Sequence, residues 1–323
     1  TLETGCGRTY DVDAAVLAMG NLPPARADIE GYHADPWDPA ATEGLDKALP
    51  VLVLGTGLSM VDTVLTLLER GFHGPIYALS RHGMLPQSHA PSSPWTYLRL
   101  DAEDRRSLRS LVRAVRRETQ AAQLLGVNWR CVIDALRPHT QILWQEMTPA
   151  DKRRFLRHVR ALWDVHRHRM APPVAAEIAE IRARGVLQPL AGRLVKLRRG
   201  IGTIKAVWRP RGGTTEEELQ VQRVIDCTGP GRDYADLTDP LIHQLVSDGL
   251  ARPDPYRLGL DVTPQGALVG PDGSAWPNLF GVGPLTRGSF WEITSVPDIR
   301  AQAERVATTV LANARRTVRA VAA

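Results

Sequence analysis

The apolar residues of the chain follow two different patterns. Val51–Leu54 is a short continuous apolar run, which is typical of a central parallel strand buried on both faces. From Val61 to Leu68 the apolar positions recur three and four residues apart, which predicts a helix with one buried face. A second strand is predicted at residues 75–80. Residues 50–80 are therefore predicted to form a strand–helix–strand unit.

The flanking regions extend this pattern into a larger α/β fold. Residues 101–183 have helical spacing interrupted by prolines, and a final helix is predicted from about Pro297 to Ala314. Before the central unit, Thr1–Tyr10 is predicted to be a hairpin and Val12–Met19 a buried strand. Further strands are predicted at residues 186–190, 193–197, 204–209, 219–221 and 224–226.

The junction between the central strand and its helix carries a Gly-x-Gly turn. Gly55 and Gly57 stand directly after the strand, and Leu58 and Ser59 open the helix. Glycines allow a tight turn and a close approach of a pyrophosphate to the unpaired amides of a helix N-terminus. Met60 occupies the position of a third glycine, which governs packing between helix and strand more than phosphate contact. The turn predicts a dinucleotide site; the alternative is a tight turn without a ligand.

The second strand of the unit ends at Ser80 and Arg81, where an acidic residue would hold a ribose 2′-hydroxyl. A hydroxyl and a guanidinium suit a 2′-phosphate instead. We therefore predict NADPH rather than NADH. An arginine that merely lies on the sheet edge is the alternative.

Cysteine and histidine spacing argues against metal and dithiol chemistry. The three cysteines, Cys6, Cys131 and Cys227, form no Cys-x-x-Cys pair, which disfavours disulfide reductases and zinc sites. His166 and His168 are two residues apart, so they do not share a helix face. We predict no metal site.

Composition and charge leave the partner class partly open. Apolar residues make up 43% of the chain, no apolar run is long enough to cross a membrane, and the start lacks a signal-peptide pattern. A cytoplasmic protein without a membrane partner is expected. The net charge is +5, with arginines concentrated at residues 99–117 and 152–169. Solvated helix faces are the favoured interpretation of these stretches, and a nucleic-acid surface is the alternative.

Several motifs resemble those of the two-dinucleotide-binding flavoproteins. The resemblance is to the bacterial FAD/NAD(P)-binding proteins of the YdhS-like type and, more distantly, to the flavin N-hydroxylating monooxygenases. The motifs span the chain from end to end, and their order is as informative as any one of them. They are Val16–Asn21, Gly55–Asp62, Ser80–Pro86, Asp226–Pro230 and Gly283–Glu292.

The resemblance implies positions for both cofactors. Ala18 and Gly20 would border FAD, and Thr228 and Gly229 would border the nicotinamide dinucleotide. The segment with Gly283, Pro284, Phe290 and Trp291 would pass along the flavin, although relatives often carry an acidic residue where Pro284 stands. Ordinary core packing is the alternative for the two aromatic residues. The family begins with an FAD-binding Gly-x-Gly-x-x-Gly segment, so the resemblance implies an N-terminally truncated sequence.

These implications define the expected architecture. It is an α/β fold in which a Rossmann-type three-layer nicotinamide-binding domain, residues 49–230, is inserted into a partial FAD-binding domain. The FAD-binding pieces would be residues 1–48 and 231–323, and a helical insertion would occupy about residues 100–183.

The expected activity is hydride transfer from NADPH to FAD, with electrons passing to oxygen or an organic small-molecule substrate. No side chain needs to act as a nucleophile, and the sequence identifies no catalytic residue. A non-catalytic NADP(H)-binding module, a nucleic-acid-binding protein and an NADPH-only dehydrogenase are the alternatives. The sequence does not define the substrate or the oligomeric state.

Overall fold

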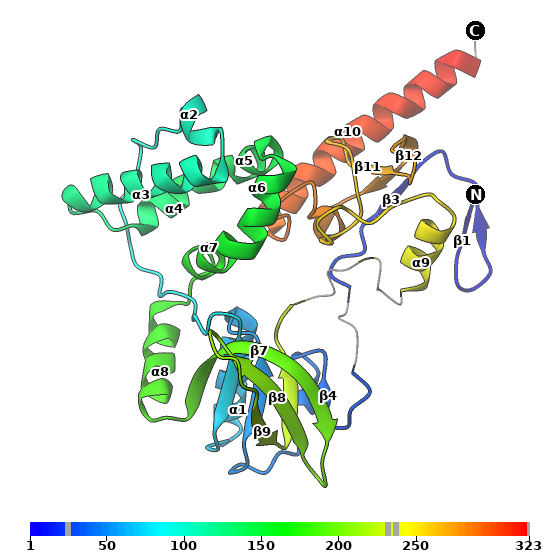
Figure 1. Cartoon of the computed structure of the whole chain (residues 1–323). Helices are drawn as coiled ribbons and strands as arrows, with labels where there is room; N and C mark the ends of the chain where they lie inside the picture. The colour runs from blue at the N-terminus through cyan, green and yellow to red at the C-terminus, as the bar shows by residue number, and fades with distance from the viewer. Residues whose placement is uncertain (23–26, 230–233, 235–238, 322–323) are drawn as a thin grey trace. The chain divides into compact units, whose positions relative to one another are not determined.

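A computed structural model describes residues 1–22, 27–229, 234 and 239–321, with side chains up to Ala314 (Figure 1). The chain divides into two compact units. Unit 1 comprises Thr1–Leu22, His139–Glu146 and Pro230–Ala323, and unit 2 comprises Pro23–Pro138 and Met147–Gly229.

Unit 2 is built on a seven-stranded sheet with strand order β4-β10-β5-β6-β7-β8-β9. Neighbours from β4 to β7 run parallel, whereas β7, β8 and β9 are antiparallel. The strands are β4 (Tyr32–His33), β5 (Val51–Leu54), β6 (Ile76–Ser80), β7 (Leu187–Arg199), β8 (Ile204–Pro210), β9 (Glu217–Val221) and β10 (Arg223–Asp226).

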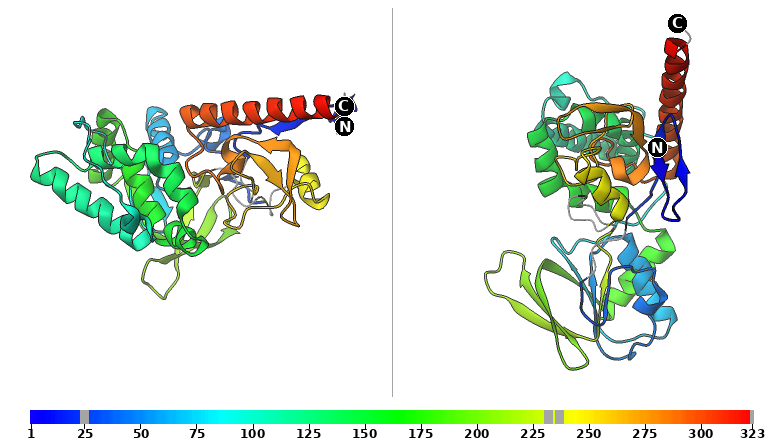
Figure 2. Two further views of the ribbon diagram at one scale, coloured as in Figure 1. Left: turned by 90° about the horizontal axis from the view of Figure 1, so that it is seen from above. Right: turned by 90° about the vertical axis from the view of Figure 1, so that its right-hand side faces the viewer.

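The two faces of this sheet are covered differently. Val51 and Val53 face helices α1 (Leu58–Glu69) and α8 (Pro172–Ala183), with which they share one apolar cluster. Leu52 and Leu54 face the other way and cluster with residues of β8 and β9. The right-hand view of Figure 2 shows the helices on one side of the sheet and the curled antiparallel strands on the other. Unit 2 is therefore an α/β structure of three layers in which strands, not helices, form the third.

Helices occupy most of the chain between β6 and α8. In chain order, this segment begins with α2 (Ala102–Arg105), α3 (Leu108–Leu124), α4 (Arg130–Leu136), the 3-10 turn η2 (Arg137–His139) and α5 (Thr140–Glu146). They are followed by α6 (Pro149–Arg154), the π-helical turn η3 (Phe155–Val159) and α7 (Arg160–Arg167). Asp101, Ser107 and Thr148 cap the starts of α2, α3 and α6 with side-chain oxygens.

Unit 1 contains a three-stranded sheet with order β11-β12-β3 and an exposed hairpin of β1 and β2. Its core includes Phe280, Leu260 and Leu285, which are almost fully buried. The elements are β1 (Leu2–Glu3), β2 (Thr9–Tyr10), β3 (Ala15–Leu17), α9 (Pro240–Ser247), β11 (Ala267–Val269), β12 (Ala275–Gly281), η4 (Gly283–Thr286) and α10 (Val296–Val321).

The observed organisation differs from the expected one at three places. β3 is shorter than the predicted buried strand, and Val16 is 45% exposed because β3 lies at the edge of its sheet. β4 pairs with β10, so the contacts place residues 27–48 in unit 2, whereas the sequence put the boundary at residue 48. Residues 139–146, inside the helical segment, belong to unit 1.

Candidate dinucleotide site

The predicted nucleotide residues of unit 2 meet at one edge of the sheet. β10, β5 and β6 are parallel neighbours, with Asp226 paired to Leu54 and Leu54 paired to Leu79. Their carboxyl ends therefore lie side by side. The chain continues from β5 to β6 on one side, whereas β10 lies on the other, so the strand order reverses next to β5. This is the point of an α/β sheet where ligands bind most often.

Gly55 makes the close approach between two of these strand ends. Its φ is +97°, and a Cβ built on it would lie 2.6 Å from the carbonyl oxygen of Cys227. A side chain at this position would be strained by the backbone and would collide with the neighbouring strand end. The sequence predicted a tight turn here, and the contact with Cys227 supplies its physical reason.

Gly57 precedes α1 and leaves its N-terminus open. It caps the helix without any side-chain hydrogen bond, and no atom lies within 4 Å of a Cβ built on it. The first amides of α1, beginning with Leu58 and Ser59, thus receive no hydrogen bond from a capping side chain. Met60 is fully buried in the cluster between α1 and the sheet. Its side chain fills the helix–strand contact that a third glycine would tighten, and it points away from the open turn.

The loop after β6 is ordered by Ser80. Its Oγ accepts a hydrogen bond from the Gly83 amide (3.0 Å) and lies 2.9 Å from Oγ1 of Thr56, which also donates to the Met84 carbonyl (2.7 Å). The Ser80 hydroxyl therefore ties the Gly55–Gly57 turn to this loop. Arg81, by contrast, is exposed at the same edge. Ser80 and Arg81 were both predicted to contact the 2′-phosphate, and of the two Arg81 is the side chain exposed to solvent.

The end of β10 is held by the carboxylate of Asp226, which belongs to one of the sequence motifs but was not predicted as a site residue. Asp226 accepts hydrogen bonds from the Thr228 amide (2.8 Å) and hydroxyl (2.7 Å), and from the Tyr32 hydroxyl of β4 (2.7 Å). Burial, and then the bond to Asp226, raise the pKa of Tyr32, so this phenol stays a proton donor. The network fixes the turn at Thr228 and Gly229, whose φ is +97°. Pro230, the last residue of that motif, lies outside the described residues.

Cys227 and His166 are both engaged in contacts within the fold. Burial raises the pKa of Cys227 to about 12, and its thiol lies 3.3 Å from Oγ1 of Thr63. It is therefore protonated at neutral pH. His166 contacts the Leu162 carbonyl through Nδ1 (2.7 Å) and packs edge-on against Trp129. Within the residues described, no three His, Cys, Asp or Glu side chains gather as metal ligands would.

In unit 1, the predicted flavin segment is anchored by a buried amide. Gln302 of α10 accepts from the Gly283 amide (2.7 Å) and donates to Oγ1 of Thr286 (2.8 Å), which donates to the Gly283 carbonyl (2.9 Å). Pro284 lies in the first turn of η4. Gly283 and Gly20 both have positive φ, and a Cβ on either would meet no atom within 4 Å. Ala18 is exposed just after β3.

The aromatic residues of this segment are part of the packing of unit 1. Phe290 is 4% and Trp291 3% exposed, and Phe290 lies in the main apolar cluster. The Trp291 ring lies 5.0 Å from that of Trp144 on α5, and Trp144 Nε1 donates to the Gly288 carbonyl (2.8 Å). Gln141, one turn earlier on α5, donates to the Trp291 carbonyl. Neither Trp144 nor Gln141 was predicted, because their spacing indicated only a helix within the insertion.

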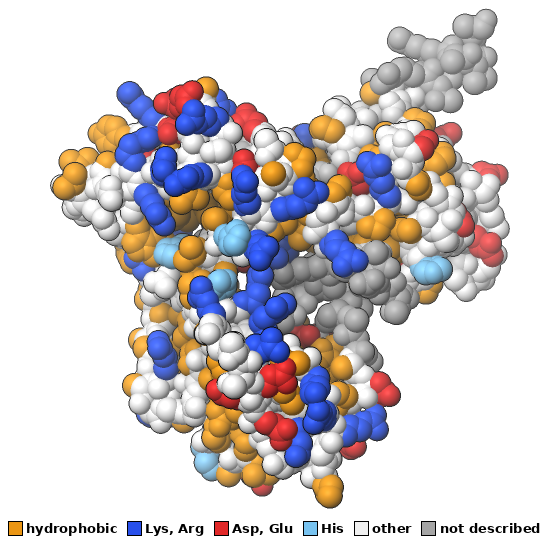
Figure 3. Space-filling view, in the orientation of Figure 1, with side chains coloured by type: hydrophobic (Ala, Val, Ile, Leu, Met, Phe, Trp, Pro, Cys, Tyr) orange, Lys and Arg blue, Asp and Glu red, His pale blue; other side chains and the backbone are white. Residues whose placement is uncertain are grey.

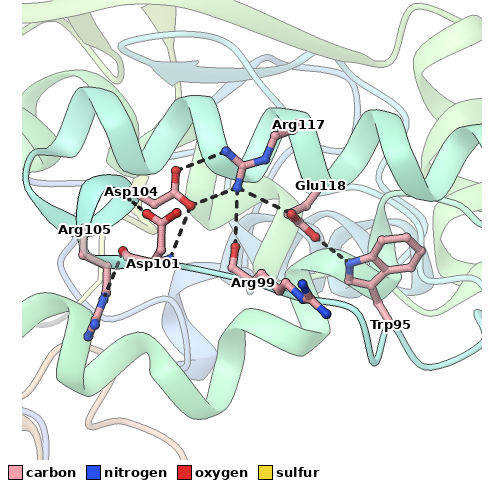
Figure 4. Close-up of polar contacts among 7 residues, drawn as sticks. All are labelled: Trp95, Arg99, Asp101, Asp104, Arg105, Arg117 and Glu118. Atoms are coloured by element: carbon pink, nitrogen blue, oxygen red, sulfur yellow. Dashed lines mark hydrogen bonds and ion pairs between the residues drawn. The ribbon is translucent and has the colours of Figure 1, made fainter.

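The two arginine-rich stretches differ in exposure: all arginines from Arg99 to Arg117 are exposed, as expected of a solvated helix face, whereas Arg160, Arg167 and Arg169 are partly buried. Arg117 on α3 forms ion pairs with Asp104 (2.9 Å) and Glu118 (3.6 Å), and Glu118 accepts from the Trp95 indole (3.1 Å) (Figure 4). In the second stretch, the Arg169 side chain is 6% exposed and contacts Asp134. Burial and ion pairing, beyond a solvated helix face, therefore account for part of the positive charge. Figure 3 shows other Lys and Arg side chains on the surface, close to His side chains.

Among the described helices, none combines the length and apolar character that crossing a membrane would require. The chain matches no known protein-family model. Over 143 residues it is 27% identical to uncharacterised proteins of Mycobacterium tuberculosis and Mycobacterium bovis. That match covers 42% of this chain and 25% of those proteins, so the alignment spans a quarter of their length.

Solved structures show a clearer likeness. L-lysine 6-monooxygenase from Pseudomonas syringae matches with a TM-score of 0.55 and 17% identity, covering 93% of this chain and 63% of that enzyme. Ornithine hydroxylase from Pseudomonas aeruginosa matches with a TM-score of 0.54 and 13% identity, covering 96% and 65%. The ornithine N-hydroxylase of Kutzneria sp. 744, determined with FADred, NADP+ and L-orn, matches with a TM-score of 0.52 and 15% identity, covering 94% and 63%. The chain spans less than two thirds of each enzyme and shares the fold of the part that it covers.

Proposed function

We propose that this chain is part of an FAD-dependent, NADPH-using oxidoreductase related to the YdhS-like flavoproteins, with unit 2 binding the nicotinamide dinucleotide and unit 1 contributing to FAD binding. One observation carries the proposal. The turn of Gly55–Ser59, the loop after Ser80 and the turn at Thr228 meet at the switch point of the sheet. The likeness to ornithine N-hydroxylase supports the same pair of cofactors.

The geometry of unit 2 fits a dinucleotide. The open N-terminus of α1, together with the empty space at Gly57, would receive the pyrophosphate. Arg81 would meet the 2′-phosphate of NADPH, and Thr228 and Gly229 would border the dinucleotide from β10. The hydrogen bonds of Ser80 and Asp226 hold these elements in place without themselves needing to touch the ligand.

The geometry of unit 1 supports a flavin-binding role for the residues around η4. Gly20 and Gly283 each leave open space where a side chain would stand, and Gln302 fixes the Gly283 turn to α10. Phe290 and Trp291 would shape this region by packing, as their burial indicates. FAD would accept the hydride of NADPH and pass electrons to oxygen or an organic small molecule. The residues of this chain would bind and orient the cofactors.

The test is the visible absorbance spectrum of the purified chain after incubation with excess FAD and desalting. We expect retained flavin bands that bleach when NADPH is added without oxygen. The matched variant is Gly57→Val, which should retain flavin but lose bleaching, since its side chain would occupy the pyrophosphate space. Flavin that stays oxidised with NADPH in the unmodified chain would contradict the proposal.

A non-catalytic NADP(H)-binding module is the second candidate. It is favoured by the fact that the strand ends, the α1 N-terminus and Arg81 all lie within unit 2. A colourless chain that still binds NADP+ in calorimetry would support this candidate. The ion pairs of the arginine-rich stretches provide no comparable support for nucleic-acid binding.

A further inference from the structure

Three separate parts of unit 2, each carrying an arginine, come together near the end of β6. Arg81 follows the strand directly. Ser80 pairs with Ala191 of β7, and the Ala191 carbonyl accepts a hydrogen bond from the Arg211 amide (2.8 Å). The backbone of Arg211 is therefore fixed one strand away from the end of β6.

The helical segment reaches the same loop. The Gln87 amide donates to the Val165 carbonyl of α7 (2.9 Å), and the Gln87 carbonyl accepts from the Met170 amide (2.9 Å). Arg160 is the first residue of α7 and directly follows the π-helical turn η3, a distortion that often occurs at functional sites. Its side chain is only 12% exposed.

The charges in this group are of one sign. Burial lowers the pKa of Arg160 most, Asp164 opposes that shift, and the charge of Arg81 lowers the pKa further. Burial also lowers the pKa of His82, followed by the charges of Arg211 and Arg81. Arg160 and Arg81 therefore repel each other, and His82 would be repelled by Arg81 and Arg211 once it is protonated.

Little negative charge offsets this repulsion. Asp164 contacts Arg160 (Nε to Oδ2, 3.4 Å), whereas Arg81 and Arg211 have no ion-pair partner among the residues that the structure describes. A site that collects like charges at the cost of repulsion is suited to an anion.

We propose that Arg81, Arg160 and Arg211 together bind the 2′-phosphate of NADP(H), with Arg160 supplied by the helical segment. The inference rests on the proposed dinucleotide site, because the ligand is placed by the adjacent β5–α1 turn and the end of β6. The helical segment then selects the cofactor, in addition to the strand end that the sequence indicated. The same chemistry would also accept free phosphate, which the experiment must separate.

The test is calorimetric binding of NADP+ and NAD+ to the whole chain and to Arg160→Met and Arg211→Met. Loss of one charged hydrogen bond to a phosphate corresponds to about a tenfold weaker Kd for NADP+. We expect that loss in each variant, with the Kd for NAD+ changed less than about twofold. Arg160→Lys should recover part of the NADP+ affinity. Arg157→Met removes an exposed arginine three residues earlier and is the matched control, with no change expected.

The outcomes separate this inference from the proposed function. Equal binding of NAD+ and NADP+ by the unmodified chain, or equal losses for both in Arg160→Met, would overturn the inference and leave the dinucleotide site standing. Displacement by inorganic phosphate as effective as that by 2′-AMP would overturn the assignment to the adenosine 2′-phosphate. Binding of neither dinucleotide would overturn both.

Discussion

Two clusters of charged residues in unit 2 differ in how their positive charge is balanced. Around α3, Arg117 is paired with Asp104 and Glu118, and Glu118 is bonded to the Trp95 indole (Figure 4). We call this the paired cluster. At the end of β6, the charges of Arg81 and Arg211 lower the pKa of His82, and the charge of Arg81 lowers that of Arg160, which contacts Asp164; we call Arg81, His82, Arg160 and Arg211 the basic cluster.

The difference separates charge that stabilises the fold from charge that serves a ligand. In the paired cluster, Arg117 forms ion pairs with two largely buried carboxylates, so its charge is already compensated within the chain. In the basic cluster the folded chain keeps its positive groups together against their repulsion, and an anion would relieve it. The number of arginines in a stretch does not show whether their charge is compensated within the chain. The positions of the neighbouring acidic residues show it.

The largest expected loss of stability comes from a substitution at Gly55, in the turn next to the basic cluster. Gly55→Val should lower the free energy of unfolding by about 2–4 kcal/mol, because a side chain there requires strained backbone and collides with Cys227. Gly57→Ala is the matched control and should fold normally. Urea unfolding measures both, and comparable stability of the two variants would contradict the account of the turn.

The next effect concerns the paired cluster. Arg117→Met should destabilise the chain by about 1–2 kcal/mol, since Asp104 and Glu118 lose their cation, although the half-exposed Arg117 side chain limits the loss. Binding of NADP+ should not change. The hydrogen bond with Arg117 is the main cause that lowers the pKa of Asp104. The stability contributed by the Arg117–Asp104 pair is therefore present above about pH 4 and is lost as the pH falls through the lowered pKa of Asp104.

Urea unfolding of Arg117→Met and the unmodified chain at neutral and acidic pH provides the check. The two curves should approach one another in acid, where the unmodified chain has lost the same interaction. A constant difference would show that packing, not charge, carries the effect.

Sequence pattern is sufficient for features that depend on neighbouring residues. The β5–α1 turn and the end of β6 were predicted because strand, glycines and helix adjoin in sequence. Arg160 and Arg211 could not be predicted as partners of Arg81, because only strand order and the packing of α7 bring them there. Trp144 was missed for a similar reason: its contacts in unit 1 are more than 100 residues away.

A smaller effect on the free energy of unfolding is expected for a substitution in the basic cluster than for one in the paired cluster. Arg211→Met should change the free energy of unfolding at pH 7 by less than about 0.5 kcal/mol, because Arg211 is exposed and its charge acts on a His82 ring that is neutral at that pH. The same substitution type thus destabilises the paired cluster and not the basic one. Urea unfolding of both variants in low salt is the measurement. A loss for Arg211→Met as large as that for Arg117→Met would remove the distinction between the clusters.

The finest test follows the protonation of His82. Burial, then Arg211 and Arg81, lower its pKa, so the imidazole is neutral at pH 7 and folding is less favourable as pH falls through the ordinary histidine range. A bound phosphate would reverse part of the repulsion and raise the pKa of His82. We expect 2′-AMP, but not adenosine, to move the His82 ring resonances to a higher titration midpoint in NMR. His82→Gln identifies those resonances. An unchanged midpoint at saturating 2′-AMP would mean that the phosphate binds elsewhere, and the basic cluster would then be a repulsive feature of the fold without a ligand.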